Sequence, residues 1–430
     1  MEKLYLGIGR RDITPGVGAR LFGYQDNVYS KSVNDKLTAT AFYFKSGSTV
    51  SLIVSASICL FDSDLADTIR DKIESNTGIP SGNIILAATH THSGPYTASG
   101  VALGEREHEF CNGVLIPRIL EAVSDAVSDA EAVTVGYSVG ESYAAVNRRE
   151  HTPDGRVKLG QNKDGVFNPK MTVIAFKTER GRIKGTLIHY GMHGTASGMN
   201  TEITRDWSGV MTDGIEDITG APCAFLNGPE GDVGPRLSNG RTAGNITLMK
   251  ELGEIAASDA KRIYESISDF GDAKMNCLTE TITLPVKPRL PLEFVKDELE
   301  KYMQDRLVSL GLYWRDHYER VLDSYKTGYE EKSAHTEPQT LIKIGNIVFV
   351  AVPYELFAEI GLDIQKGYDA ICVLPISNAN GSCGYFPTES EIPLGGYETH
   401  SFRTAMIQPL ANNADKCFVS ETKKNIDKLI

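Results

Sequence analysis

A short apolar run that ends in two histidines constrains this chain more than any other stretch. Residues 83–88 read Asn-Ile-Ile-Leu-Ala-Ala, which is typical of a buried strand, and Thr-His-Thr-His-Ser-Gly-Pro follows at 89–95. In extended backbone, the side chains of His90 and His92 would leave the strand on the same side. Because α/β sheets place ligand chemistry at the carboxyl ends of their strands, this segment predicts a metal site or an acid–base pair. One capping histidine beside one surface histidine would give the same spacing.

Helical periodicity alternates with apolar runs along the chain, which is typical of an α/β fold. The sequence predicts helices at 63–78, 107–128, 206–218, 242–267 and 292–329, and a further helix that follows Glu355 and ends near Lys366. It predicts strands at 5–15, 37–44, 50–60, 83–88, 133–139, 172–176, 182–188, 221–226, 277–286 and 371–375, and a hairpin at 341–352. No repeat or low-complexity linker interrupts this order. We therefore expect one multilayer α/β domain of sheets and helices over residues 1–430, in which the irregular part at 287–338 forms a helical subdomain or a lid.

Composition disfavours several classes of function. The chain has 430 residues, a formal net charge of −12 and 41% hydrophobic residues. It can bury a large core, and its acidic charge balance disfavours binding of nucleic acids, which require a basic face. No apolar stretch is long enough for a transmembrane helix or a signal peptide. The seven cysteines are scattered and form no Cys-x-x-Cys motif, which disfavours disulfides. We therefore expect a cytoplasmic protein, and the sequence allows an oligomer.

Other predicted strands also end in polar side chains. His193 follows the strand predicted at 182–188, and Glu355 follows the hairpin predicted at 341–352. Zinc binds histidine nitrogen and carboxylate oxygen, and a hydrolytic zinc site keeps one position open for water. Two histidines, a carboxylate and one further oxygen donor would therefore suffice, although no contiguous motif such as His-Glu-x-x-His is present. Alternatively, Glu355 caps the N-terminus of the helix that follows it.

Several motifs occur in the same order as in a known family. They are Gly9–Pro15, Gly23-Tyr24, Ala88–Pro95, Asn147-Arg148, His193–Thr195, Gly231–Pro235, Pro353–Glu355, Tyr385 and Tyr397-Glu398. In this respect the chain resembles the neutral/alkaline non-lysosomal ceramidases, which are zinc amidases that cleave the N-acyl bond of sphingolipids. The resemblance covers most of the chain, and its most specific motif is Ala88–Pro95.

The resemblance implies a catalytic domain of the neutral ceramidase type that hydrolyses an N-acyl amide bond with a metal-activated water. It implies a Zn²⁺ ion held by His90, His193, Glu355 and Tyr385. It places His92, Arg148 and Tyr397 around the metal, where Arg148 and a tyrosine hydroxyl would stabilise the oxyanion. The substrate would be a small-molecule or lipid-like N-acyl compound, which places the protein in lipid metabolism.

The chain departs from the family at Gly234, where the family has a serine that acts as nucleophile or contacts the substrate. Gly234 has no side chain for either role. Three explanations follow: metal-activated water suffices with Asp232 as proton acceptor, the substrate differs, or the site is inactive. Secreted members also carry a leader and a C-terminal β-sandwich domain, and we expect this chain to lack both.

Because of this departure, two alternative functions stay open. In the first, the chain is a hydrolase of the same fold that acts on a small soluble amide, ester or lactone. In the second, it is a non-catalytic homologue that binds a metal or a ligand.

Overall fold

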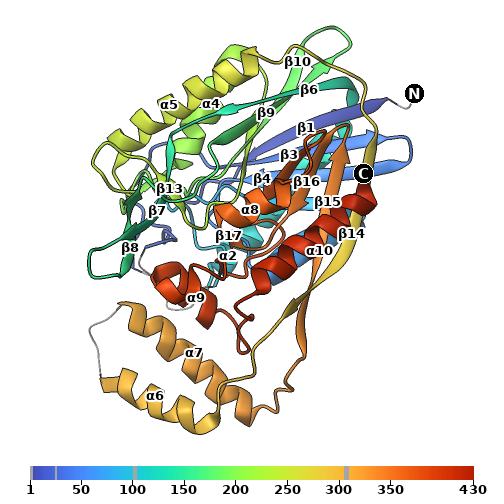
Figure 1. Ribbon diagram of the computed structural model, residues 1–430. Helices are drawn as coiled ribbons and strands as arrows, with labels where there is room; N and C mark the ends of the chain where they lie inside the picture. Colours follow the sequence, from blue (N-terminus) through green and yellow to red (C-terminus); the bar gives the residue numbers. More distant parts are fainter. Residues whose placement is uncertain (1–2, 25–26, 100–103, 305–308) are drawn as a thin grey trace.

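Two β-sheets lie face to face at the centre of the molecule, and helices cover the outer face of each sheet (Figure 1). The computed structural model describes residues 3–24, 27–99, 104–304 and 309–430. These residues form an α/β fold in four layers, with helices outside and sheets inside. The predicted α/β fold class is therefore confirmed.

The larger sheet has eight strands in the order β12-β10-β9-β6-β1-β3-β4-β5. Its strands are β1 (Leu4–Asp12), β3 (Thr38–Ser46), β4 (Thr49–Ala56), β5 (Ile84–Ala88), β6 (Glu131–Glu141), β9 (Lys170–Thr178), β10 (Ile183–Tyr190) and β12 (Cys223–Asn227). Neighbouring strands are antiparallel except at the two ends of the order, where β4 pairs with β5 and β10 pairs with β12 in parallel.

Strands of this sheet are apolar on both faces, because each face is buried. In β3, Ala39, Ala41 and Tyr43 point to the helices on the outer face. Phe42 and Phe44 point inward to the second sheet. The outer helices are α1 (Ser63–Thr77), α3 (Ile116–Ser128), α4 (Asp206–Thr219) and α5 (Ile246–Glu265).

The second sheet has four strands in the order β14-β15-β16-β18. They are β14 (Met275–Pro285), β15 (Ala334–Ile344), β16 (Ile347–Ala351) and β18 (Cys372–Ile376). Ile342, Phe349 and Leu374 pack against the inner face of the larger sheet. The opposite face packs against α8 (Ala358–Gln365) and α10 (Ala414–Leu429).

The two edges of the larger sheet approach one another. The Ser55 Oγ of β4 donates a hydrogen bond to the Phe225 carbonyl of β12 at 2.6 Å. Just beyond the strands, Thr91 and Gly194 form a parallel bridge. The segment after β5 therefore lies beside the segment after β10, although about a hundred residues separate them in the sequence.

Shorter elements surround this junction. Three strands form a small sheet in the order β13-β7-β8, with β7 (Ala145–His151), β8 (Val157–Asn162) and β13 (Val233–Pro235). The others are β2 (Ser32–Val33) paired with β11 (Glu202–Ile203), β17 (Glu355–Leu356) paired with β19 (Tyr385–Phe386), α2 (His108–Phe110) and α9 (Tyr397–Thr404). Of these, only the start of the helix predicted at 107–128 was expected from the sequence, and a π-helical turn at Cys111–Leu115 interrupts that helix.

The segment 287–338 contains the helices α6 (Leu292–Gln304) and α7 (Ser309–Lys326), and its last residues belong to β15. Residues 305–308 of the helix predicted at 292–329 lie outside the described residues. Figure 1 shows this helical pair below α9, away from the two sheets. Its role as a lid stays a prediction. Within the described residues, no helix is both long and apolar enough to span a membrane.

Candidate metal and catalytic site

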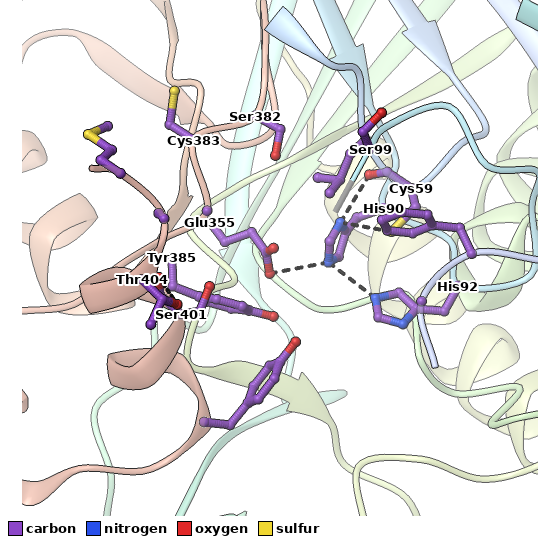
Figure 2. Close-up of a pocket in the computed structure, with 17 residues that line it drawn as sticks. Cys59, His90, His92, Ser99, Glu355, Ser382, Cys383, Tyr385, Ser401 and Thr404 are labelled. Atoms are coloured by element: carbon purple, nitrogen blue, oxygen red, sulfur yellow. Dashed lines mark hydrogen bonds and ion pairs between the residues drawn. The ribbon is translucent and has the colours of Figure 1, made fainter. Parts of the chain in front are cut away.

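Four side chains from distant parts of the chain meet where strands end. His90 follows β5, His193 follows β10, and Glu355 and Tyr385 are paired residues of β17 and β19. The Oε2 of Glu355 lies 3.4 Å from His90 Nε2 and 3.1 Å from His193 Nε2. The Tyr385 hydroxyl lies 3.2 Å from His193 Nε2. All four side chains are buried, and Figure 2 shows His90, Glu355 and Tyr385 around one cavity.

The backbone fixes the orientation of both imidazoles. His90 Nδ1 donates to the Cys59 carbonyl at 3.0 Å, and His193 Nδ1 donates to the Glu230 carbonyl at 2.8 Å. Since a carbonyl oxygen only accepts, each Nδ1 carries a proton, and each Nε2 is left to face Glu355. Backbone bonds of this kind are usual behind metal-binding histidines.

The charges of the site require a cation. Burial would raise the pKa of Glu355, but His90 and His193 hold it well below its usual range, so the carboxylate is ionised. Burial, together with Arg148 and His90, lowers the pKa of His193 to about 3, so this imidazole is neutral. Burial lowers the pKa of His90, but Cys59 and Glu355 outweigh it and raise that pKa well above its usual value. Either a proton on His90 or a metal ion would therefore neutralise the negative charge of Glu355.

The donor set fits a metal ion. The buried Oε2 of Glu355 accepts no hydrogen bond from the part of the chain that the structure describes. His90, His193 and Glu355 offer ligand atoms that all lie within 4.8 Å of one another. Two imidazoles, one carboxylate and one phenol oxygen suit Zn²⁺, which binds histidine nitrogen and carboxylate oxygen in four-coordinate sites.

The path of the backbone differs from the extended strand that the sequence suggested. β5 ends at Ala88, and His90 adopts a left-handed conformation with φ 66°. The prediction that His90 and His92 lie on one side of an extended strand is therefore wrong, because the strand ends before His90. The two rings nevertheless converge, with their Nε2 atoms 3.3 Å apart. A left-handed non-glycine residue costs about 1–3 kcal/mol, and such strain is concentrated at functional sites.

His92 lines the cavity beside the candidate metal ligands. Its ring lies edge-on to Tyr24, with centroids 5.2 Å apart, and a Cβ at Gly23 would lie 2.4 Å from its Nδ1. The absence of a side chain at Gly23 therefore leaves room for the imidazole. Burial, with His90 and His193, lowers the pKa of His92 well below its usual value, so this ring is neutral.

Arg148 and the tyrosines complete the site. The Arg148 Nη2 donates to the Tyr385 hydroxyl at 2.9 Å, and Arg148 Nε donates to Glu398 Oε1 at 2.9 Å. The rings of Tyr385 and Tyr397 lie edge to face, with centroids 5.5 Å apart. Tyr397 also lines the cavity. The structure thus brings Arg148 and Tyr397 to the predicted metal ligands.

The cavity has a volume of about 290 Å³. Besides His90, Glu355, Tyr385 and His92, its lining combines apolar side chains with hydroxyl groups; these are Phe22, Leu60, Met406, Ser99, Ser382 and Ser401. Figure 2 shows Ser382 and Ser401 on the Glu355 side and Ser99 on the His90 side. A substrate bound here would therefore meet both apolar and hydrogen-bonding groups.

Four predicted site residues are not part of the cavity lining: His193, Arg148, Asp232 and Gly234. His193 and Arg148 still contact the Tyr385 hydroxyl, whereas Asp232 and Gly234 have other surroundings. Asp232 Oδ1 accepts from the Ala358 backbone N–H at 2.8 Å, and Oδ2 accepts from Asn147 Nδ2 at 3.0 Å. Asp232 thus caps α8, and burial raises its pKa to about 7. Gly234 lies in β13, where a Cβ would lie 2.8 Å from Thr242 Cβ. The Thr242 side chain therefore occupies the space that a serine at position 234 would need.

The sequence did not indicate that two buried glutamates, Glu230 and Glu398, belong to the surroundings of this site. Glu230 receives a hydrogen bond from Asn378 at 2.5 Å, and its carbonyl orients His193. Glu398 binds Arg148. Neither residue follows an apolar run directly, and the only signal for Glu398 was its position next to Tyr397.

Comparison with known families gives a match for more than half of the chain. The family described as "Neutral/alkaline non-lysosomal ceramidase, N-terminal" matches residues 4–247. Neutral ceramidase A of Dictyostelium discoideum is 26% identical over 258 residues, which are 54% of this chain and 35% of that protein. Neutral ceramidase of Mycobacterium tuberculosis is 25% identical over 264 residues, which are 54% of this chain and 40% of that protein. The chain thus aligns with less than half the length of these curated relatives.

Solved structures resemble the whole chain. The crystal structure of neutral ceramidase from Pseudomonas aeruginosa has a TM-score of 0.75 at 18% identity, and the match covers 100% of this chain and 75% of that chain. A structure described as ceramidase complexed with C2 has a TM-score of 0.76 at 17% identity. That match covers 100% of this chain and 76% of the other chain. At these identities, the likeness establishes the fold.

Proposed function

Because the chain belongs to the neutral/alkaline non-lysosomal ceramidase family, we propose that it is a zinc-dependent hydrolase of N-acyl amide bonds. The observation that supports this most strongly is the convergence of His90 Nε2, His193 Nε2 and the Tyr385 hydroxyl around Glu355. These four residues would hold the ion. When bound, zinc lowers the pKa of a coordinated water toward neutrality and polarises a carbonyl oxygen.

The residues around the ligands supply the remaining chemistry. Tyr397 lines the cavity and donates to the oxygen of the scissile carbonyl as negative charge develops there. Arg148 adds positive charge behind Tyr385. His92 is neutral and lies in the cavity wall, so it accepts the proton that the attacking water loses. We assign this proton to His92 rather than to Asp232, because both Asp232 oxygens are occupied outside the cavity.

The first substrate to test is ceramide. The curated relatives carry the name neutral ceramidase, and an N-acyl sphingolipid presents the amide carbonyl that the site would polarise. On this proposal the protein acts in sphingolipid metabolism. The cytoplasmic location and the formation of an oligomer stay predictions from the sequence.

A second candidate function is hydrolysis of a small soluble amide, ester or lactone. The cavity volume of about 290 Å³ favours it, because this is at the lower end of the range for sites that enclose drug-sized ligands. The hydroxyl groups of Ser382 and Ser401 in the lining would suit a polar substrate.

Metal analysis combined with turnover tests the proposal. We expect stoichiometric zinc in the purified chain and release of fatty acid from a short-chain fluorescent ceramide. His90→Ala and Glu355→Ala should each abolish zinc binding and fatty-acid release, because each variant lacks one proposed metal ligand. His151→Ala is the matched control, since His151 is exposed at the end of β7. Turnover of small amides or esters without ceramide cleavage would favour the second candidate. Bound zinc without turnover of any acyl compound would favour a non-catalytic homologue.

A further inference from the structure

A buried carboxylate lies behind the wall of the cavity, on α9. The Glu398 side chain is 1% exposed and is not part of the cavity lining. Its Oε1 accepts from Arg148 Nε at 2.9 Å, and its Oε2 accepts from Arg149 Nη1 at 2.8 Å. Glu398 thus does not touch a substrate, yet both of its oxygens are bound by arginines.

Arg148 links this carboxylate to the metal site. The guanidinium is planar and rigid, so the direction of Nη2 is fixed once Nε is held. Arg148 Nη2 donates to the Tyr385 hydroxyl at 2.9 Å, and that hydroxyl lies 3.2 Å from His193 Nε2. A continuous chain of contacts therefore runs from Glu398 through Arg148 to the oxygen atom that would bind the metal.

Glu398 also determines which carboxylate pairs with Arg148. The arginine is buried, and a buried charge that loses its partner is strongly destabilised. Glu355 is a second carboxylate whose charge acts on Arg148. Without the charge of Glu398, the guanidinium would be drawn toward Glu355. It would then compete with the cation for that ligand.

Arg149 holds Glu398 in place from the other side. Its Nε donates to Glu391 Oε2 at 2.6 Å, and its Nη2 donates to the Gly395 carbonyl at 2.7 Å. The segment that leads into α9 is therefore tied to β7 by the same arginine that binds Glu398 Oε2. Arg149 thus pairs with both Glu391 and Glu398, whereas Glu398 is the carboxylate that binds Arg148 Nε.

We propose that Glu398 is a positioning residue that keeps Arg148 on the Tyr385 hydroxyl and away from Glu355. The inference rests on the proposed metal site, because Tyr385 and Glu355 are two of its four ligands. Glu398 acts only through Arg148. It therefore sets the affinity of the site for metal without contacting the metal or the substrate.

The test is Glu398→Gln in the full chain, which keeps the shape of the side chain and removes its charge. We expect the Arg148–Tyr385 hydrogen bond to be lost in a crystal structure of the variant. We also expect zinc to bind about 10–100-fold more weakly in a competition titration with a chelator. Glu391→Gln is the matched control, because it removes a carboxylate that pairs with Arg149 alone, and it should leave zinc affinity unchanged.

A double variant separates positioning from general loss of structure. If Glu398 acts through Arg148, Glu398→Gln combined with Arg148→Met binds zinc no more weakly than Arg148→Met alone, whereas independent effects would add. Glu398→Asp keeps the charge and should recover much of the affinity. If Glu398→Gln alone does not fold, the comparison of the double variant with Arg148→Met still tests the inference.

Two results would overturn the inference. One is an unchanged Arg148–Tyr385 hydrogen bond in Glu398→Gln, and the other is additivity in the double variant. If the unmodified chain binds no zinc, the proposed function fails, but the crystal structure of the variant still decides whether Glu398 positions Arg148.

Discussion

The space beside Gly234 determines what a serine could do at that position. A Cβ there would lie 2.8 Å from Thr242 Cβ and 2.9 Å from Thr242 Cγ2, which is closer than side chains pack. We expect Gly234→Ser to destabilise the protein by about 1–3 kcal/mol, as overpacked substitutions do. Thr242→Gly removes both atoms, so the double variant should be less destabilised than the sum of the two single changes.

Denaturant unfolding of the four proteins measures this coupling. Additive effects would show that Thr242 is not the obstacle. A gain in ceramide cleavage is expected, if at all, only in the double variant, where the serine has room.

Glu230 makes folding stability depend on pH. Burial raises the pKa of this carboxyl from 4.5 to about 8. Between these values the folded chain keeps a proton that the unfolded chain has lost. Stability therefore falls as the pH rises through this window, by about 1.4 kcal/mol for each pH unit at most. Glu230→Gln removes this titration. As the pH rises from 5 to 8.5, we therefore expect the variant to gain stability relative to the unmodified chain by a few kcal/mol.

Urea unfolding at pH 5 and pH 8.5 measures the effect, with Glu254→Gln as control because Glu254 lies exposed on α5. A difference between variant and unmodified chain that is the same at both pH values would contradict the buried titration.

The sequence predicted the residues that converge at the candidate metal site, but not the groups that orient them. His90, His193 and Glu355 each follow an apolar strand, and that pattern can be read locally. Glu230 and Glu398 are recognised only by burial and by partners far away in the chain, such as Asn378 and Arg148. Asp232 shows the reverse case, because a polar residue in a glycine-rich turn suggested catalysis and instead caps α8.

At the scale of elements, α9 connects the cavity with the helical pair α6–α7. Trp314 Nε1 on α7 donates to His400 Nδ1 on α9 at 3.0 Å, and Arg320 donates to the Thr404 carbonyl at 2.5 Å. α9 also carries Tyr397 and Glu398. Movement of the helical pair would therefore be transmitted to Tyr397 and Glu398, next to the candidate metal site.

We expect Trp314→Phe to increase hydrogen exchange of the α9 backbone, because the substitution keeps an aromatic ring but removes the donor to His400. Hydrogen-exchange mass spectrometry measures this. Arg315→Ala is the control on the same helix, since Arg315 pairs with Glu319. Unchanged exchange in α9 would show that the helical pair and α9 are not coupled by this contact.

Elements with apolar periodicity were predictable, and elements held by charged groups were not. The strands of the larger sheet and α1, α3, α4 and α5 lie close to their predicted ranges. β7 was missed because it contains Asn147, Arg148 and Arg149, whose burial depends on Glu398 and Asp232 rather than on an apolar face. α10 was missed because charged residues outnumber apolar ones along Ala414–Leu429.

At the scale of the whole molecule, one ion would join both sheets. His90 and His193 follow strands of the larger sheet, whereas Glu355 and Tyr385 follow strands of the smaller one. Metal binding should therefore stabilise the complete fold. We expect about 2.7 kcal/mol at a free zinc concentration one hundred times the Kd. Calorimetry with and without a chelator measures this shift in Tm.

The shift should become smaller at acidic pH. The pKa of His90 is raised, and below that value binding has to displace a proton. Glu355→Gln should abolish the shift, whereas His151→Ala should retain it. A zinc-dependent Tm in Glu355→Gln would show that the ion binds elsewhere.

The division of the ligands between two sheets also affects how such proteins are counted in genomes. The stretch that defines the family here, residues 4–247, contains His90 and His193 but neither Glu355 nor Tyr385. A survey that relies on that stretch alone inspects two of the four donors. Chains that have lost the other two through mutation would still be catalogued as hydrolases, so the inventory of active members should be drawn from both halves of the polypeptide.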